Sequence, residues 1–215
     1  MHKSKGDAGL IKALDSHIEE HFGGNFYVLD EIDSPLVHVD LFIVPPAQDR
    51  PYHVLFTCGM AEKPMTVPEG FEPRRFAELT LSLPQDWPMT KDAWKDERWW
   101  WPLRLLKQMA RYPHENETWL GFGHSVPGST SGVPFAANTQ MTDIAILEPR
   151  TISEEAATFH DDDRGEVSVW ALFPVYPSEK EFKHRRSAQE LQQLFDSDGV
   201  TELVQPGRGS VIPFE

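Results

Sequence analysis

The sequence has one cysteine, little positive charge and no long apolar run. Cys58 alone cannot form an internal disulfide, and it excludes a zinc site built from several cysteines. No stretch approaches the roughly 18 uninterrupted apolar residues of a membrane-spanning helix. The chain begins with lysines and no apolar run like that of a signal peptide. We therefore expect a cytoplasmic protein that does not enter a membrane.

Positive charge is scarce. Lys and Arg total 20 against 34 Asp and Glu, so the formal net charge is −14. Because nucleic-acid backbones are polyanions, their binding proteins normally present a basic face. The basic clusters here are Arg74-Arg75 and residues 183–186, and both have acidic residues nearby. We predict no direct contact with nucleic acid, and a preference for basic protein partners.

Proline is the residue in excess, with 18 in a chain of 215. Prolines spread along a chain shorten its regular elements and fix its loops. The hydrophobic share of 40% and the charged share of 25% are otherwise typical of a folded domain. We find neither an internal repeat nor a linker, so we expect one domain over residues 1–215.

Apolar spacing predicts two helices. Between residues 10 and 22 an apolar residue recurs at every fourth position, which is the spacing of one helix face, and Gly23-Gly24 ends the pattern. A second helix is predicted to begin at Pro102, which suits a first turn, and to end at Tyr112-Pro113.

Two capping-box patterns predict helices near the C-terminus. Ser187 with Glu190 precedes an apolar run that ends at Gly199. Ser178 with Glu181 matches the same box slightly earlier in the chain. A helix is therefore expected to follow each serine.

Alternating apolar residues predict a set of strands. The clearest is 37–44, in which His38 and Asp40 share the face opposite Val37 and Val39. Residues 25–32 look extended, and further strands are predicted at 52–57, 79–83, 144–147 and 166–173, with an edge strand at 211–212. Strands in two groups with helices between and around them indicate an α+β fold, in which a mixed β-sheet packs with helices.

One metal-site pattern stands out. His17, Glu20 and His21 match the H-x-x-E-H string, which puts both imidazoles on one helix face and would let Glu20 act as base for a zinc-bound water. The alternative is an exposed helix edge, where histidines near the C-terminus are favourable without any metal. Because no third ligand is evident downstream, we expect no metal and no cofactor. A zinc-dependent hydrolase remains the alternative.

Other catalytic patterns are incomplete. Residues 121–126 lack the third glycine of a dinucleotide site, and residues 128–132 lack the Gly-Lys-Ser/Thr continuation of a phosphate loop. Pro127 stands where a nucleophile elbow needs glycine. We therefore predict that the protein is not an enzyme. The long irregular stretch 121–140 is of the kind that is functional or disordered.

Tryptophans crowd together between Trp87 and Trp101. Trp99, Trp100 and Trp101 are consecutive, so they cannot all face one core from a regular element. Because tryptophan dominates interface hot spots, we predict that these three contact a partner. The alternative is an aromatic core that anchors the following helix. A further alternative is a small-ligand-binding module built from these tryptophans and the 121–140 stretch.

A series of short motifs follows one another along most of the chain. They are His38-Val39-Asp40 with Pro45, Thr57-Cys58-Gly59-Met60, Pro64-Met65 with Pro68, Ala77-Glu78-Leu79 through Leu83-Pro84, Trp101-Pro102, Ala110-Arg111-Tyr112-Pro113-His114, Gly123-His124, and Phe173-Pro174-Val175-Tyr176 with Glu179. Together, over roughly residues 10–200, they resemble the bacterial Suppressor of fused-like (SUFU) domain family.

The resemblance implies an α+β fold with flanking helices and no catalytic motif. In the larger, two-lobed animal relative, a SUFU-like domain clasps an extended peptide of Gli transcription factors by strand addition. This chain lacks the second lobe. Bacterial single-domain relatives include immunity proteins, so the resemblance implies an immunity-type, protein-binding domain that neutralises a toxin. The net charge suits a basic toxin domain. The sequence indicates no oligomeric state.

The family-like segments also supply candidate site residues. His38, Asp40, Glu78 and His124 are their polar members, and we nominate them for partner binding beside the three tryptophans. The alternative is a buried polar network that specifies the fold.

Overall fold

The computed structural model describes residues 6–31, 36–128 and 132–213. Its helices are α1 (Ala8–Phe22), α2 (Glu97–Glu115), α3 (Pro177–Arg185) and α4 (Ala188–Asp198). Its strands are β1 (Tyr27–Leu29), β2 (Asp40–Val44), β3 (Tyr52–Cys58), β4 (Ala77–Pro84), β5 (Ser125–Pro127), β6 (Asp143–Leu147), β7 (Thr158–Asp161) and β8 (Gly165–Val175). Short 3₁₀ helices include η1 (Met60–Glu62), η2 (Glu72–Arg74) and η4 (Glu155–Ala157).

All the described strands join one mixed sheet in the order β1-β2-β3-β4-β8-β6-β5. The β4–β8 pair is parallel and the other pairs are antiparallel. Strand β7 lies off this path, beside the first half of β8. The predicted α+β fold with a mixed sheet is confirmed.

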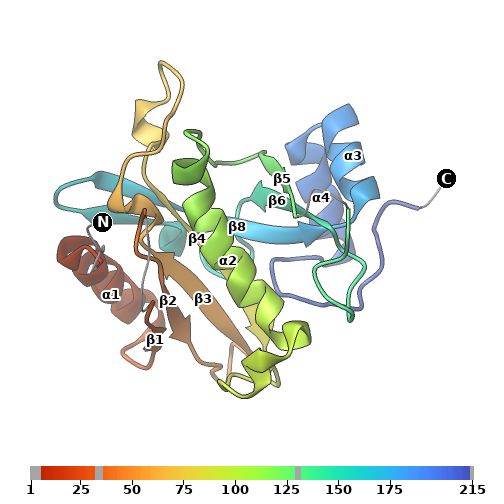
Figure 1. Ribbon diagram of the computed structural model, residues 1–215, viewed down its shortest axis with the longest axis horizontal. Helices are drawn as coiled ribbons and strands as arrows, with labels where there is room; N and C mark the ends of the chain where they lie inside the picture. Colours follow the sequence, from red (N-terminus) through yellow and green to blue (C-terminus); the bar gives the residue numbers. More distant parts are fainter. Residues whose placement is uncertain (1–5, 32–35, 129–131, 214–215) are drawn as a thin grey trace.

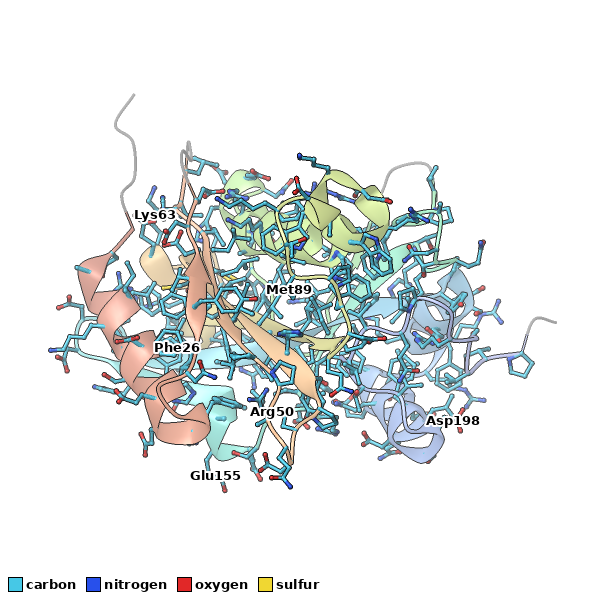
Figure 2. All side chains as sticks on the ribbon, turned by 90° about the horizontal axis from the view of Figure 1, so that it is seen from below. Phe26, Arg50, Lys63, Met89, Glu155 and Asp198 are labelled. Carbon is cyan, nitrogen blue, oxygen red and sulfur yellow. The ribbon has the colours of Figure 1, made fainter. Side chains whose placement is uncertain are left out.

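Helices cover both faces of the sheet. Helix α2 crosses one face, whereas α1 and α4 lie against the other face at its two ends (Figures 1 and 2). Successive side chains of β2 pack on opposite faces of the sheet. Leu41 and Ile43 join the core under α2, while Phe42 and Val44 join the core under α1. The strand is therefore buried along its whole length.

Helix α1 follows the predicted pattern closely. Its apolar stripe, Leu10, Leu14 and Ile18, is fully buried, and Gly23 ends the helix with a positive φ of 80°. The helix begins at Ala8, two residues before the stripe, because the Asp7 carboxylate accepts the Leu10 N–H at 2.9 Å and caps the first turn.

Helix α2 begins five residues before the predicted start at Pro102. Asp96 caps it by accepting the Arg98 N–H at 2.9 Å, so the three consecutive tryptophans lie in its first turns. Pro102 cannot donate to the carbonyl of Arg98, four residues earlier. The Asn138 side-chain amide donates to that carbonyl instead, at 3.0 Å. A residue from a distant loop thus satisfies the acceptor that the proline leaves open.

Of the three features predicted near the C-terminus, one is confirmed and two are wrong. Helix α4 begins after Ser187, which accepts the Glu190 N–H at 3.0 Å, and ends at Gly199, as expected. The cap predicted at Ser178 is wrong, because α3 already begins at Pro177 and the Ser178 hydroxyl pairs with Ser210. The edge strand predicted at 211–212 is also wrong, since both backbone N–H groups donate to side chains.

Two strands were not expected from the sequence. Strand β5 lies inside the stretch predicted to be irregular and pairs with β6. Strand β7, with a burial pattern that alternates along four residues, pairs with the start of β8. Both are short, so their own sequences carry little signal. No helix in the described ranges is long and apolar enough to cross a membrane.

Candidate partner-binding surface

Glu78 on β4 is buried beneath the turn that follows β3. Its carboxylate accepts backbone N–H groups from Gly59 at 2.8 Å, Ala61 at 3.0 Å and Met60 at 3.3 Å, and the Thr57 hydroxyl at 2.6 Å. Burial raises the pKa of Glu78 to about 7, although these donors favour the ionised form. Glu78 therefore fastens η1 to the sheet.

His38 and Asp40 lie together at the start of β2. The Asp40 carboxylate lies 2.9 Å from His38 Nε2, within hydrogen-bond distance, and accepts a hydrogen bond from the Glu31 N–H at 2.7 Å. Glu31 in turn pairs with Arg111 on α2. The side chains of His38 and Asp40 are only 11% and 9% exposed. These contacts link β2 to α2, which is the arrangement expected of a buried polar network, and partner binding by His38, Asp40 or Glu78 stays a prediction.

The tryptophans of α2 differ in exposure. Trp101 is fully buried and stacks on Phe135, with ring centroids 5.3 Å apart and planes at 8°. Trp99 and Trp100 are partly buried against the same core. Trp87 meets the Trp99 ring edge-on at 5.2 Å and donates its Nε1–H to the Trp99 carbonyl. A partner could touch Trp99 and Trp100 in this fold, whereas Trp101 is covered.

The loop after β5 packs against the start of α2. Phe135 lies on Trp101, and Asn138 reaches the Arg98 carbonyl. A small hollow of about 280 Å³ opens beside them, lined by Val133, Pro134, Ala136, Ala137, Thr139 and Gln140. The structure therefore brings together the two segments of the small-ligand alternative, which stays a prediction.

His124 lies in the turn before β5. Its Nδ1 accepts the Gly121 N–H at 2.9 Å, and its ring meets Trp119 edge-on at 4.4 Å. Burial, helped by the nearby Lys183, lowers the pKa of His124. His124 thus lies apart from the other nominated polar residues, since His38, Asp40 and Glu78 gather around the turn after β3.

The two histidines of α1 are adjacent but have other partners. Their rings lie 4.6 Å apart, and His17 Nε2 lies 3.0 Å from the Ala156 carbonyl, within hydrogen-bond distance. Burial lowers the pKa of His17. In the part of the chain that the structure describes, no group of three or more His, Cys, Asp or Glu side chains could hold a metal ion. The donor set therefore does not fit a zinc site.

A break in the sheet next to β8 was not expected from the sequence. Ala171 pairs with Leu147 of β6 and Ser168 pairs with Thr158 of β7. The two β8 residues between them, Val169 and Trp170, pair with Glu78 and Leu79 of β4 on one side and with neither β6 nor β7 on the other. A hollow of about 450 Å³ lies here, lined by Glu148, Pro149, Arg150, Ile152, Glu154, Ala157, Thr158, Ser168, Val169 and Trp170.

A second hollow of about 350 Å³ continues from the first. Its lining is Arg74, Phe122, Glu148, Arg150, Trp170, Gln189, Gln192, Gln193 and Asp196. Because Glu148, Arg150 and Trp170 line both hollows, we treat them as one surface, the Trp170 groove. Its residues come from segments far apart in the sequence, so no local spacing could have predicted it.

Charged side chains surround the Trp170 groove. The lining of the two hollows contains three carboxylates, Glu148, Glu154 and Asp196, and two arginines, Arg74 and Arg150. Arg150 pairs with Asp196 at 2.8 Å and with Glu148 at 3.4 Å, and these contacts raise its pKa. The groove thus combines aromatic surface with a slight excess of carboxylates.

These features define an α+β domain with a groove at a break in its mixed sheet. A family model described as Suppressor of fused protein (SUFU) matches residues 35–209, and the chain belongs to this family. The predicted resemblance is therefore confirmed. Among curated proteins, none matches the chain.

Solved structures of the family share this fold. A putative SUFU homolog from Neisseria gonorrhoeae FA 1090 is 16% identical with a TM-score of 0.66, over 96% of this chain and 97% of the other. A chain in the crystal structure of the Sufu-Fu complex is 18% identical with a TM-score of 0.67, over 96% of this chain and 93% of the other. Drosophila Suppressor of Fused is 18% identical with a TM-score of 0.66, over 94% of this chain but only 51% of that protein.

Proposed function

We propose that this chain is a non-enzymatic domain that binds another protein in the Trp170 groove. In its biological role, we propose, it is a cytoplasmic immunity-type protein that neutralises a basic toxin domain. The observation that carries the proposal is the groove itself, where β8 lacks a neighbouring strand between β7 and β6 and Trp170 lies beside Phe122 and arginines.

The composition of the groove supports protein binding. Tryptophan and arginine are the side chains most enriched at the energetic centres of protein interfaces. Val169 and Trp170, which pair with β4 but with neither β6 nor β7, line the same groove. A family member has been crystallised in a Sufu-Fu complex, which is a protein–protein assembly.

The polar residues nominated from the sequence favour binding over catalysis. Glu78, His38 and Asp40 hold elements of the fold together, and each has neighbours within hydrogen-bond distance. A catalytic group instead has to reach a substrate.

Electrostatics support a basic partner. The net charge of −14 would speed the encounter with a positively charged protein and weaken its complex as salt rises. The carboxylate excess in the groove lining acts in the same direction at short range. A toxin that cleaves nucleic acid is a suitable partner, because its own site is built to hold phosphates.

The test is a binding experiment with purified proteins. The chain is mixed with basic products of genes that neighbour its own, and complexes are resolved by size-exclusion chromatography at low and high salt. We expect one stoichiometric, salt-sensitive complex in which the toxic activity is lost. No complex with any of these proteins would remove the immunity role.

A pair of tryptophan variants locates the surface. Trp170→Ala is expected to weaken the complex about 30-fold, because central interface tryptophans contribute roughly 2 kcal/mol or more. Trp100→Ala, a partly buried tryptophan away from the groove, serves as the matched control. The opposite ranking would move the contact from the Trp170 groove to the tryptophans of α2.

A further inference from the structure

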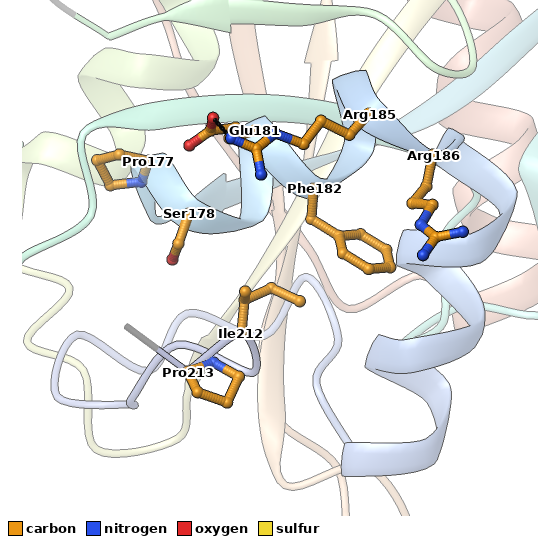
Figure 3. A pocket seen from close by; sticks show the side chains of 8 residues that line it. All are labelled: Pro177, Ser178, Glu181, Phe182, Arg185, Arg186, Ile212 and Pro213. Atoms are coloured by element: carbon orange, nitrogen blue, oxygen red, sulfur yellow. Dashed lines mark hydrogen bonds and ion pairs between the residues drawn. The ribbon is translucent and has the colours of Figure 1, made fainter. Parts of the chain in front are cut away.

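A further hollow lies near the C-terminal end of the described chain. It has a volume of about 690 Å³ and lies between α3 and the segment that precedes Pro213 (Figure 3). Its lining is Pro177, Ser178, Glu181, Phe182, Arg185, Arg186, Ile212 and Pro213. We call it the α3 groove. It shares no lining residue with the Trp170 groove.

One buried carboxylate fastens both walls of the α3 groove. Glu179, with no exposed surface, accepts the Tyr176 N–H at 2.9 Å at the start of α3. It also binds the Arg208 guanidinium at 2.6 and 2.8 Å and the Val211 N–H at 3.0 Å on the opposite wall. Because the walls are already joined, a ligand would not bear the cost of ordering them.

The floor of the α3 groove is apolar. Phe182 packs partly against the core that α4 shares with the sheet, and Ile212 lies across the hollow from it (Figure 3). Ile212 keeps part of its surface exposed. An apolar side chain of a ligand could therefore remove surface of both residues from water, which is favourable in proportion to the area covered.

The rim of the α3 groove is basic, unlike the chain as a whole. Arg185 pairs with Glu181 one turn earlier, on the exposed side of α3. Arg186 is exposed, and no carboxylate in the described ranges pairs with it. In a chain with a net charge of −14, an arginine without a carboxylate at the edge of an apolar hollow is complementary to a negative group of a ligand.

We propose that the α3 groove docks a segment of a protein partner in which an acidic residue lies next to a large apolar residue. The apolar side chain covers Phe182 and Ile212, and the carboxylate pairs with Arg186. The apolar floor favours a peptide over a nucleic acid, which would need several cations to hold its phosphates. This surface goes beyond the proposed function, since it takes a segment of opposite charge at a separate place.

Isothermal titration calorimetry with two peptides tests the docking. The first is a terminally blocked peptide with glutamates on both sides of a leucine, and the second replaces the glutamates with lysines. We expect the glutamate peptide to bind and the lysine peptide not to bind. Absence of binding by the glutamate peptide, or equal binding of both, would overturn the proposal.

Variants separate local contact from overall charge. Arg186→Glu and Ile212→Ser are each expected to weaken binding of the glutamate peptide about tenfold. Lys12→Glu makes the same charge change as Arg186→Glu on an exposed site of α1, at the opposite end of the sheet (Figure 1), and is expected to leave binding unchanged. If Lys12→Glu weakened peptide binding as much as Arg186→Glu, the effect would come from net charge alone, and this would contradict a docking site.

Two further readouts complete the test. Excess inorganic phosphate that displaced the peptide from the protein would indicate a simple anion site, against the proposal. Arg186→Glu is also expected to leave the toxin complex at the Trp170 groove intact. Failure of the immunity role therefore leaves the peptide result standing, and failure of peptide binding leaves the immunity role standing.

Discussion

The Asn138 side chain donates to the Arg98 carbonyl at 3.0 Å, the acceptor that Pro102 leaves without an intrahelical donor. The two residues are 40 positions apart, and their contact joins the loop after β5 to the first turn of α2. It explains how a helix passes through a buried proline. It also predicts an energetic coupling between Asn138 and Pro102, because together they determine which group donates to the Arg98 carbonyl.

A double-mutant cycle measures this coupling. Asn138→Ala is expected to lower the free energy of unfolding by about 1 kcal/mol, because it leaves the Arg98 carbonyl without this donor. In a Pro102→Ala background the loss should shrink, since an alanine at that position can donate its own N–H to Arg98. Urea unfolding of the four proteins gives the interaction energy. An equal cost of Asn138→Ala in both backgrounds would contradict the account.

Glu78 predicts a specific pH dependence of stability. Its pKa in the folded protein is about 7, above the ordinary 4.5, so between these values the folded protein holds a proton that the unfolded chain has lost. Its contribution to stability is therefore largest below pH 4.5 and falls by about 3 kcal/mol as pH rises to about 7. Glu78→Gln should remove this fall.

The measurement is the difference in unfolding free energy between the native protein and Glu78→Gln across this pH range. Subtracting the two pH profiles isolates Glu78. Burial lowers the pKa of His17 and His114, so these groups add stability as pH rises in both proteins and cancel in the difference. Glu69→Gln, at an exposed position, is the control. Parallel curves for the native protein and Glu78→Gln would show that Glu78 does not titrate in this range.

Gly59 predicts a severe and local cost of substitution. Its φ is 140°, and a Cβ there would lie 1.8 Å from the His38 carbonyl oxygen. Gly59→Ala should therefore destabilise the protein by about 3 kcal/mol or more, because the backbone must shift and the Glu78 contacts shift with it. Gly207→Ala, where a Cβ meets nothing within 4 Å, should change stability little. Similar midpoints of thermal unfolding for the two variants would contradict the close packing.

The tryptophans of α2 are expected to differ in their effect on stability. Trp101→Ala empties a fully buried site stacked on Phe135 and should cost about 3–5 kcal/mol. Trp100→Ala removes a partly exposed ring and should cost roughly 1–2 kcal/mol. Chemical unfolding compares the two directly. A larger loss of unfolding free energy for Trp100→Ala than for Trp101→Ala would contradict the burial of Trp101 beneath α2.

Much of the fold could be predicted because its signals are local. The four-residue apolar repeat of α1 predicts the buried face, and alternation over residues 37–44 predicts a strand, which the structure has as β2 over Asp40–Val44. The capping box at Ser187 predicts α4 for the same reason, since donor and acceptor lie within one turn. The SUFU resemblance depended on short motifs that follow one another in a fixed order along the chain, and the family match confirms it.

The candidate site was less predictable because its residues meet only after folding. Glu78 was nominated as a polar residue, but its part in holding η1 depends on three backbone N–H groups that the sequence does not distinguish. The Trp170 groove joins Arg74, Phe122 and Gln189, which lie on separate elements. No spacing along the chain marks such a group.

The sequence by itself determined many of the local elements, the negative charge and the family, because periodicity, capping and composition act between near neighbours or over the whole chain. The tertiary structure decided how α2 passes through Pro102, since the Asn138 side chain on a distant loop donates to the Arg98 carbonyl that the proline leaves open. It also decided the break beside Trp170, because β6 and β7 pair with different halves of β8 and leave the groove between them. Such features depend on contacts across long sequence separations, and these form only when the whole sheet does.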